Sequence, residues 1–172
     1  LNNNEIRKLN DIAQKYNIKY QNKHKLDLVD EILSNVDVIP NSIVLAQAAI
    51  ESGWGKSRFA KEYNALFGEY TYDDSEGVIP LERENGDTHL IKAFSSYSNS
   101  VESYFDNINS HYAYEDFRDI RNIMRKRNNF SNVNLLVNKL STYAEDENYI
   151  KTIRQVIKNN NFSIFDQKTI SY

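Results

Sequence analysis

The segment that most constrains this chain is Ala46-Gln47-Ala48-Ala49-Ile50-Glu51-Ser52-Gly53-Trp54-Gly55. Alanine is the best helix former and glycine one of the poorest, so the segment predicts a helix that ends just beyond Glu51. Its small side chains favour close packing on several sides. Pro40-Asn41-Ser42 is a start signal, because proline fits the first turn and Asn or Ser can cap free N–H groups. We therefore expect a buried helix from about Ser42 to Ser52.

Glu51 stands at the end of this predicted helix, at the edge of the core. Partial burial disfavours the charged form of a carboxyl group, and a carboxylic acid that keeps its proton near neutral pH is suited to general acid catalysis. The alternative is a capped core helix whose last turn carries a solvated glutamate. Trp54 also has two interpretations: a stacking surface for a sugar ring at the mouth of a cleft, or a ring packed beneath the helix end.

Composition restricts the classes of function. The chain has 172 residues with 40% hydrophobic and 26% charged residues, which predicts a single globular domain over residues 1–172. A net charge of −3 gives no indication of a nucleic-acid partner. There is no cysteine and the three histidines are scattered, so neither a metal site nor a cofactor is predicted. No stretch approaches the roughly 20 apolar residues of a membrane span. The first residues do not resemble a signal peptide, and we expect a monomer.

Apolar residues spaced by three or four predict amphipathic helices on both sides of a different central segment. Residues 66–94 are aromatic and β-prone, with a turn cluster at 73–77 and the hairpin signal Asn85-Gly86. The acids Glu69, Asp73, Asp74 and Glu76 are expected to be solvated turn residues. On the last predicted helices the apolar faces include Phe117, Ile120, Ile123 and Met124, and a tail over 162–172 should pack through Phe162, Ile164 and Phe165. The sequence thus predicts an α+β fold, in which a small β-hairpin lobe interrupts a helical domain and flanks a cleft.

Two segments give the chain a resemblance to the glucosaminidases of glycoside hydrolase family 73, especially the Bax-like branch. They are the Ala46–Gly55 segment, followed by Ser57, Phe59 and Ala60, and the segment Asn64-Ala65-Leu66-Phe67-Gly68. The resemblance covers roughly residues 38–157. It implies a lysozyme-like fold and hydrolysis of the β-1,4 bond after N-acetylglucosamine in peptidoglycan, with Glu51 as the general acid. It also implies export, to the periplasm or the cell surface.

The resemblance implies further site residues. The second carboxylate of the family lies before an Asn-Gly-type turn, where Glu82 fits best and Glu84 competes, because a strand slip of one residue exchanges the two faces. Tyr143 opens a Tyr-Ala-x-Asp segment and should reach the active site, whereas Tyr149 should pack. Glu147 stands where the family commonly has proline, which could loosen that loop. The remaining substrate-binding candidates are Trp54, Tyr70, Tyr112 and Glu84.

Several alternatives remain open. Glycoside hydrolysis can proceed with retention, with inversion, or with the N-acetyl group of the substrate as nucleophile. A lytic transglycosylase or goose-type lysozyme shares the fold and a Glu-Ser pair, although such enzymes usually continue with a Gly-Leu-Met-Gln-like segment that differs from Asn64–Gly68. A non-catalytic wall-binding module is the alternative from another class. In each case the partner is a peptidoglycan glycan strand.

Overall fold

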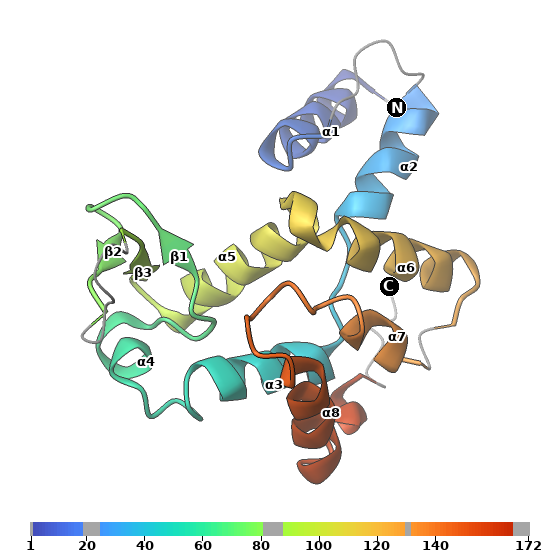
Figure 1. Ribbon diagram of the computed structural model, residues 1–172. Helices are drawn as coiled ribbons and strands as arrows, with labels where there is room; N and C mark the ends of the chain where they lie inside the picture. Colours follow the sequence, from blue (N-terminus) through green and yellow to red (C-terminus); the bar gives the residue numbers. More distant parts are fainter. Residues whose placement is uncertain (1, 19–24, 81–87, 130–131, 167–172) are drawn as a thin grey trace. The chain divides into compact units, whose positions relative to one another are not determined.

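The structure, a computed structural model, describes residues 2–18, 25–80, 88–129 and 132–166 (Figure 1). The chain divides into two compact units. The first unit comprises Leu1–Ile39 and Asp106–Arg154, and the second comprises Pro40–Phe105 and Gln155–Tyr172. As predicted, the described chain is mostly helical and carries one small antiparallel sheet.

The second unit contains the alanine-rich helix α3 (Asn41–Glu51), followed by α4 (Arg58–Tyr63). As expected, α3 is packed on several sides; its buried residues are Ser42, Ile43, Ala46, Gln47 and Ala49. The start signal was interpreted wrongly in one respect, because neither Asn41 nor Ser42 caps the helix. Pro40 is the N-cap residue, and the Ser42 N–H donates to Oδ1 of Asp166 at 2.8 Å. Residues far along the chain therefore complete the start of α3.

Asp166 follows the 3-10 helix η2 (Phe162–Phe165), which packs against α3. The Asn41 side-chain amide donates to the Phe165 carbonyl oxygen at 2.9 Å. Phe162 is half-buried, but Ile164 and Phe165 are 49% and 39% exposed. The hydrogen bonds to α3 come from backbone and polar groups, and the expectation that Ile164 and Phe165 pack is wrong.

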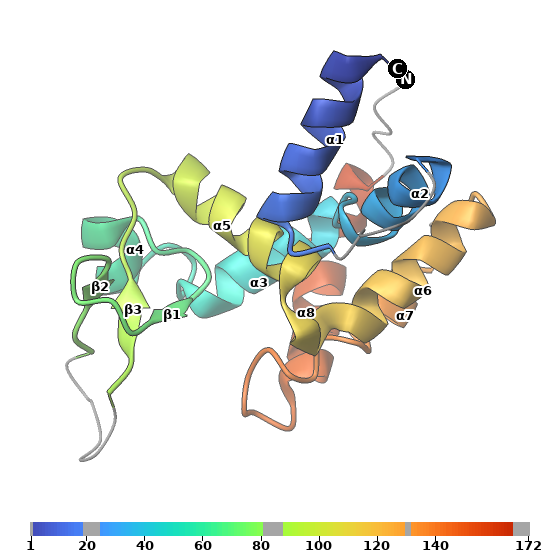
Figure 2. The same ribbon diagram turned by 90° about the horizontal axis from the view of Figure 1, so that it is seen from above.

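The sheet of the second unit has the order β1-β3-β2, with both pairs antiparallel (Figure 2). Its strands are β1 (Tyr70–Thr71), β2 (Gly77–Val78) and β3 (Leu90–Lys92). Gly77 is required by close packing, since a Cβ there would lie 2.7 Å from Cγ2 of Thr71 and would also collide with Leu90. The predicted Asn85-Gly86 turn lies outside the described residues.

The first unit contains α1 (Asn3–Lys15) and α2 (Lys25–Asn35), which pack on each other (Figure 1). Their shared core is Ala13, Ile18, Leu28 and Ile32. The unit also holds η1 (Tyr112–Tyr114), α6 (Glu115–Lys126) and α7 (Asn134–Val137). Two helices contribute residues to both units: α5 (Tyr97–Ser110) and α8 (Tyr149–Asn159).

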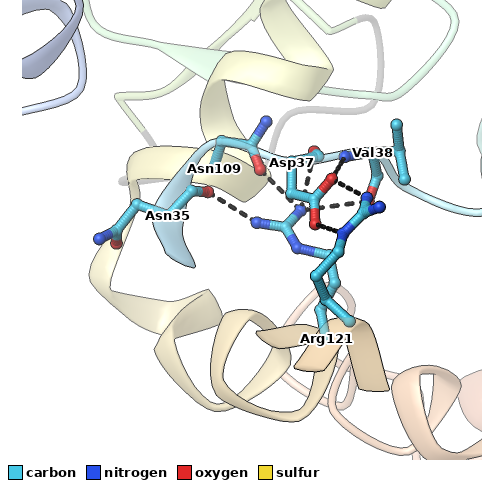
Figure 3. Close-up of polar contacts among 6 residues, drawn as sticks. Asn35, Asp37, Val38, Asn109 and Arg121 are labelled. Carbon is cyan, nitrogen blue, oxygen red and sulfur yellow. Dashed lines mark hydrogen bonds and ion pairs between the residues drawn. The ribbon is translucent and has the colours of Figure 1, made fainter. Parts of the chain in front are cut away.

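Arg121 of α6 is fully buried and joins α6 to the segment that follows α2 (Figure 3). Its guanidinium donates to the carbonyl oxygens of Asn35 (2.6 Å) and Asp37 (3.0 Å) and to Oδ1 of Asn109 (2.7 Å). The predicted apolar face of α6 was wrong at Ile123, which is 46% exposed. The helix instead buries Phe117, Arg118, Arg121 and Met124.

Candidate functional site

Glu51 is the last residue of α3 and is half-buried. The helix stops there because the chain enters a left-handed turn, with Gly53 at φ +56°. The Trp54 N–H donates to the Ala49 carbonyl oxygen at 2.7 Å and the Gly53 N–H to that of Ile50 at 3.2 Å, the paired bonds of a Schellman motif. Satisfied carbonyl groups hold the end of the helix, and with it the backbone of Glu51, in a fixed position.

Ser52 fixes the turn that follows Glu51, a role that the sequence analysis did not assign. Its side chain is 2% exposed. The hydroxyl donates to the Ala48 carbonyl oxygen at 2.6 Å and accepts from the Gly55 N–H at 2.8 Å. The Ser57 N–H then donates to the Ser52 carbonyl oxygen at 3.0 Å. A serine next to a helix-terminating glycine was the available signal, since such hydroxyls often bond to nearby backbone groups.

Trp54 lies beside Glu51 in an uncommon backbone conformation, with φ +59°. For a bulky residue this left-handed conformation is a real outlier, and such strain is concentrated at functional sites. The side chain is 56% exposed, so the interpretation as a ring packed beneath the helix end is wrong. Its role in binding a sugar stays a prediction.

The segment 64–68 runs next to the Glu51 carboxylate. Gly68 has φ +62°, and a Cβ on it would lie 3.5 Å from Oε2 of Glu51. The segment is anchored on α5: the Leu66 N–H donates to Oγ of Ser100 at 3.1 Å, and Phe67 stacks on Tyr104 with ring centroids 4.2 Å apart. The backbone beside the candidate acid is therefore held by buried contacts.

A buried hydrogen bond connects this anchor to α3. The Tyr104 hydroxyl donates to Oε1 of Gln47 at 2.6 Å, and both side chains are fully buried. Gln47 lies one turn before Glu51 on α3. Burying two polar groups is favourable only when they are paired, so this bond fixes α5 and α3 in one arrangement within the second unit.

Glu69 is not the solvated turn residue that was expected. It is half-buried, and its Oε2 accepts from the Ser103 hydroxyl of α5 at 2.9 Å. Asp73, Asp74 and Glu76 are exposed, as predicted. Hydrogen bonds from the Ser75 hydroxyl and from its backbone N–H lower the pKa of Asp73 below its ordinary value.

Tyr70 is 64% exposed, and its ring lies against His89 with centroids 4.3 Å apart. It belongs to the same unit as Glu51 and Trp54. Glu82 and Glu84, the two candidates for the second carboxylate, lie outside the described residues. The choice between them therefore stays a prediction.

Tyr143 and Tyr112 belong to the first unit. Tyr143 is half-buried between Tyr114 and Tyr149, with ring centroids 6.1 and 5.8 Å away, and it is nearly parallel to Tyr149. Tyr149 is 3% exposed, so the expectation that it packs is confirmed.

Asp146 orders the loop that carries Glu147 in the place of the family's proline. Its Oδ1 accepts from the Asn148 N–H at 2.8 Å, and its carbonyl oxygen accepts from the Tyr149 N–H at 2.9 Å. These bonds form an Asx-type turn, in which a short side chain replaces the rigidity of a proline ring. The loop is therefore held without proline.

Tyr112 is 80% exposed in η1 and is not part of the apolar face of α5. It borders a polar surface hollow of about 260 Å³, between η1, the start of α6 and the residues after α7. The hollow is lined by Tyr112, Ala113, Glu115, Asp116, Asn138, Lys139, Ser141 and Thr142. Within it, Nζ of Lys139 pairs with Oδ2 of Asp116 at 2.8 Å.

Among residues 2–18, 25–80, 88–129 and 132–166, no three His, Asp or Glu side chains form a group able to hold a metal ion. In the same ranges, no helix is both long and apolar enough to cross a bilayer.

Known proteins resemble this chain over most of its length. Protein bax of Escherichia coli K12 is 34% identical over 140 residues, which are 81% of this chain and 49% of the relative. Peptidoglycan hydrolase FlgJ of Escherichia coli O157:H7 is 35% identical over 92 residues, 48% of this chain and 29% of the relative. The chain thus spans about half the length of the first of these relatives and less of the second.

Two solved structures share the fold. The catalytic domain of the autolysin Auto from Listeria monocytogenes superposes with a TM-score of 0.54 at 19% identity, over 96% of this chain and 89% of that one. An N-acetylmuramoyl-L-alanine amidase from Staphylococcus aureus superposes with a TM-score of 0.56 at 25% identity, over 96% of this chain and 42% of that one. The family model for glucosaminidase, described as mannosyl-glycoprotein endo-β-N-acetylglucosaminidase, matches residues 26–162, and the chain therefore belongs to the glucosaminidase family of glycoside hydrolases.

Proposed function

We propose that this chain is a peptidoglycan hydrolase, an endo-β-N-acetylglucosaminidase that cleaves the β-1,4 bond between N-acetylglucosamine and N-acetylmuramic acid. The observation that carries the proposal is the position of Glu51 in a chain of this family. Its half-buried carboxylate lies at a fixed helix end, where Oε2 is 3.5 Å from the Cβ position of Gly68, and Trp54, three residues later, is exposed. The names of FlgJ and of the autolysin Auto support the peptidoglycan substrate.

In this proposal Glu51 is the general acid. Its proton passes to the glycosidic oxygen as the bond to the anomeric carbon breaks, and positive charge develops on the sugar ring. Exposed Trp54 and Tyr70, in the same unit, offer aromatic faces to sugars of the strand. Tyr112 is assigned to substrate binding by the family resemblance and by its exposure.

The negative group opposite Glu51 is Glu82 by resemblance, with Glu84 as the competing choice. A carboxyl separation of about 5 Å would favour retention, and one of roughly 6.5–9.5 Å inversion. The third route uses the substrate's N-acetyl group as nucleophile. In this third route, Tyr143 donates a hydrogen bond that orients the amide of the N-acetyl group. We place the reaction outside the cytoplasmic membrane, in the periplasm or at the cell surface, because its substrate is the wall.

Mass spectrometry of the products from purified peptidoglycan tests the proposal. We expect fragments with reducing N-acetylglucosamine ends. Anhydro-muramic ends would assign a lytic transglycosylase instead, and reducing muramic ends a muramidase. Binding of the wall without any new ends would assign a non-catalytic module. Loss of activity in Glu82→Gln but not in Glu84→Gln would settle the second carboxylate.

A further inference from the structure

One face of the sheet in the second unit carries an exposed tyrosine beside half-buried aliphatic side chains. Successive residues of a strand point to opposite faces, and Tyr70 and Val78 are both register partners of Ile91, so these three share a face. Leu90 points to the opposite face and is 5% exposed. On the other face, the Tyr70 side chain is 64% exposed. The sheet therefore buries one side and presents the other.

Two more rings extend this face. The half-buried His89 ring lies against Tyr70, with centroids 4.3 Å apart and an interplanar angle of 31°, so it supports the exposed tyrosine ring from one side. Tyr72 follows Tyr70 by two residues and is 77% exposed. We call Tyr70, Tyr72 and His89 the aromatic platform. Exposed large rings grouped in this way are typical of binding surfaces, because water solvates them poorly.

The platform lies close to the candidate acid along the chain. A Cβ on Gly68 would be 3.5 Å from Oε2 of Glu51, and Tyr70 is two residues further on. Two residues of extended chain span at most about 7 Å. A polymer held at Glu51 could therefore continue onto the platform without leaving the second unit.

The chemistry of the platform fits a glycan better than a peptide. A sugar ring has an apolar C–H face that stacks on an aromatic ring, and an edge of hydroxyl groups that bond to polar tips such as the tyrosine hydroxyl and the imidazole nitrogen. Asp73, Asp74 and Glu76 follow Tyr72 directly and are exposed. The hydroxyl groups of a sugar are donors from which these carboxylates can accept hydrogen bonds.

We propose that the aromatic platform of Tyr70, Tyr72 and His89 binds sugars of a β-1,4-linked, N-acetylated glycan strand beyond the bond that is cleaved, and so makes the enzyme prefer long strands. This inference rests on the proposed function and deepens it. Tyr72 and His89 then become residues that determine the preference for long strands.

The test compares binding to long, peptide-free glycan strands in the Glu51→Gln background, which prevents digestion. We expect about three- to tenfold weaker binding for Tyr70→Ala and for Tyr72→Ala. Tyr70→Phe keeps the ring and should bind within about twofold. Tyr97→Ala is the matched control, since Tyr97 is a 48% exposed tyrosine at the start of α5 and is not part of the platform.

A second measurement uses the active chain on long strands and on the shortest oligosaccharide that it cleaves. Tyr72→Ala should slow the first reaction three- to tenfold and leave the second unchanged. Binding equal to that of Tyr97→Ala, or a loss that appears only when stem peptides are attached, would overturn the inference. If Glu51 is not the general acid, Glu51→Gln will still release new reducing ends. The comparison of long and short substrates, which uses the active chain, tests the platform independently of that outcome.

Discussion

Gly68 lies where its backbone passes the Glu51 carboxylate, and it has a left-handed conformation that side chains disfavour. Replacing Gly68 by alanine adds one methyl group and tests both properties. In an alanine variant that methyl would lie 3.5 Å from Oε2 of Glu51, in van der Waals contact with the carboxylate.

Gly68→Ala is therefore expected to reduce kcat/KM about ten- to hundredfold, because small displacements of a catalytic group are costly. Its backbone strain should lower the free energy of unfolding by about 1–2 kcal/mol. Gly55→Ala is the matched control: Gly55 has φ +71°, and no described atom lies within 4 Å of its Cβ position. Equal losses of activity in both variants would contradict a special role for the contact with Glu51.

Arg121, like Gly68, has an environment from which a specific effect of substitution can be predicted. Burial lowers the pKa of this guanidinium to about 10, against the opposing effect of Asp37. It therefore stays charged at neutral pH and donates to the carbonyl oxygens of Asn35 and Asp37. Arg121→Met would leave the carbonyl oxygens of Asn35 and Asp37 without this donor, at a cost of about 1–3 kcal/mol in the free energy of unfolding for each buried acceptor.

The pH dependence of that loss follows from the sign of the shift. With a lowered pKa, the folded state binds fewer protons than the unfolded state only above about pH 10, so stability rises with pH in that range alone. Urea unfolding should give the same loss for Arg121→Met at pH 6 and at pH 9. Arg125→Met, which removes a half-exposed pair with Asp37, should cost only roughly 0.2–1 kcal/mol. A loss for Arg121→Met as small as that control would refute the structural role.

At the scale of elements, α3 depends on a distant segment for its first turn. Asp166 supplies the acceptor for the Ser42 N–H, from 124 positions along the chain. A carboxylate at this end also interacts favourably with the helix dipole. The helix that carries Glu51 is thus completed only when η2 packs on it.

Asp166→Ala should lower the free energy of unfolding by about 0.5–2 kcal/mol, the usual effect of a lost N-cap acceptor. Asp166→Asn retains the acceptor oxygen and should recover most of that loss, since the two residues are similar caps. Thermal unfolding measures both variants. If Asp166→Ala and Asp166→Asn lost the same free energy of unfolding, the hydrogen bond to Ser42 would not be the source of the loss.

These elements also show what the sequence could reveal. Alanine content and the Gly53 stop predict α3 and its end, because both effects are local. The cap from Asp166 could not be predicted, since it joins residues far apart in the chain. Ile123 and Arg121 show a second limit. Periodicity favours burial of the isoleucine, but the carbonyl groups of Asn35, at the end of α2, and of Asp37 bind the arginine instead.

The candidate site shows the same contrast. Glu51 was found because its helix end and the family motif coincide in the sequence. Ser52, Gly68 and the Gln47–Tyr104 bond were not assigned, although they hold the acid's surroundings, since hydrogen bonds between separate elements leave no local pattern. Glu69 was misjudged for the same reason, because Ser103 of α5 bonds to its carboxylate.

At the scale of the whole molecule, the predicted site residues come from both units. Glu51, Trp54 and Tyr70 belong to the second unit, and Tyr112 and Tyr143 to the first. Each unit orders its own residues internally, through the Tyr104 anchor in one and the stack of Tyr114, Tyr143 and Tyr149 in the other. The family match over residues 26–162 includes all five of these residues, from both units.

The most direct test of Glu51 as the general acid is the rate at which Glu51→Gln releases reducing N-acetylglucosamine ends from purified peptidoglycan. Glu62→Gln, an exposed glutamate on α4, is the matched control. We expect the Glu51 variant to lose at least about a hundredfold in rate while its thermal unfolding stays close to that of the parent, since a general acid typically contributes that much. A rate equal to that of Glu62→Gln would contradict the assignment of Glu51.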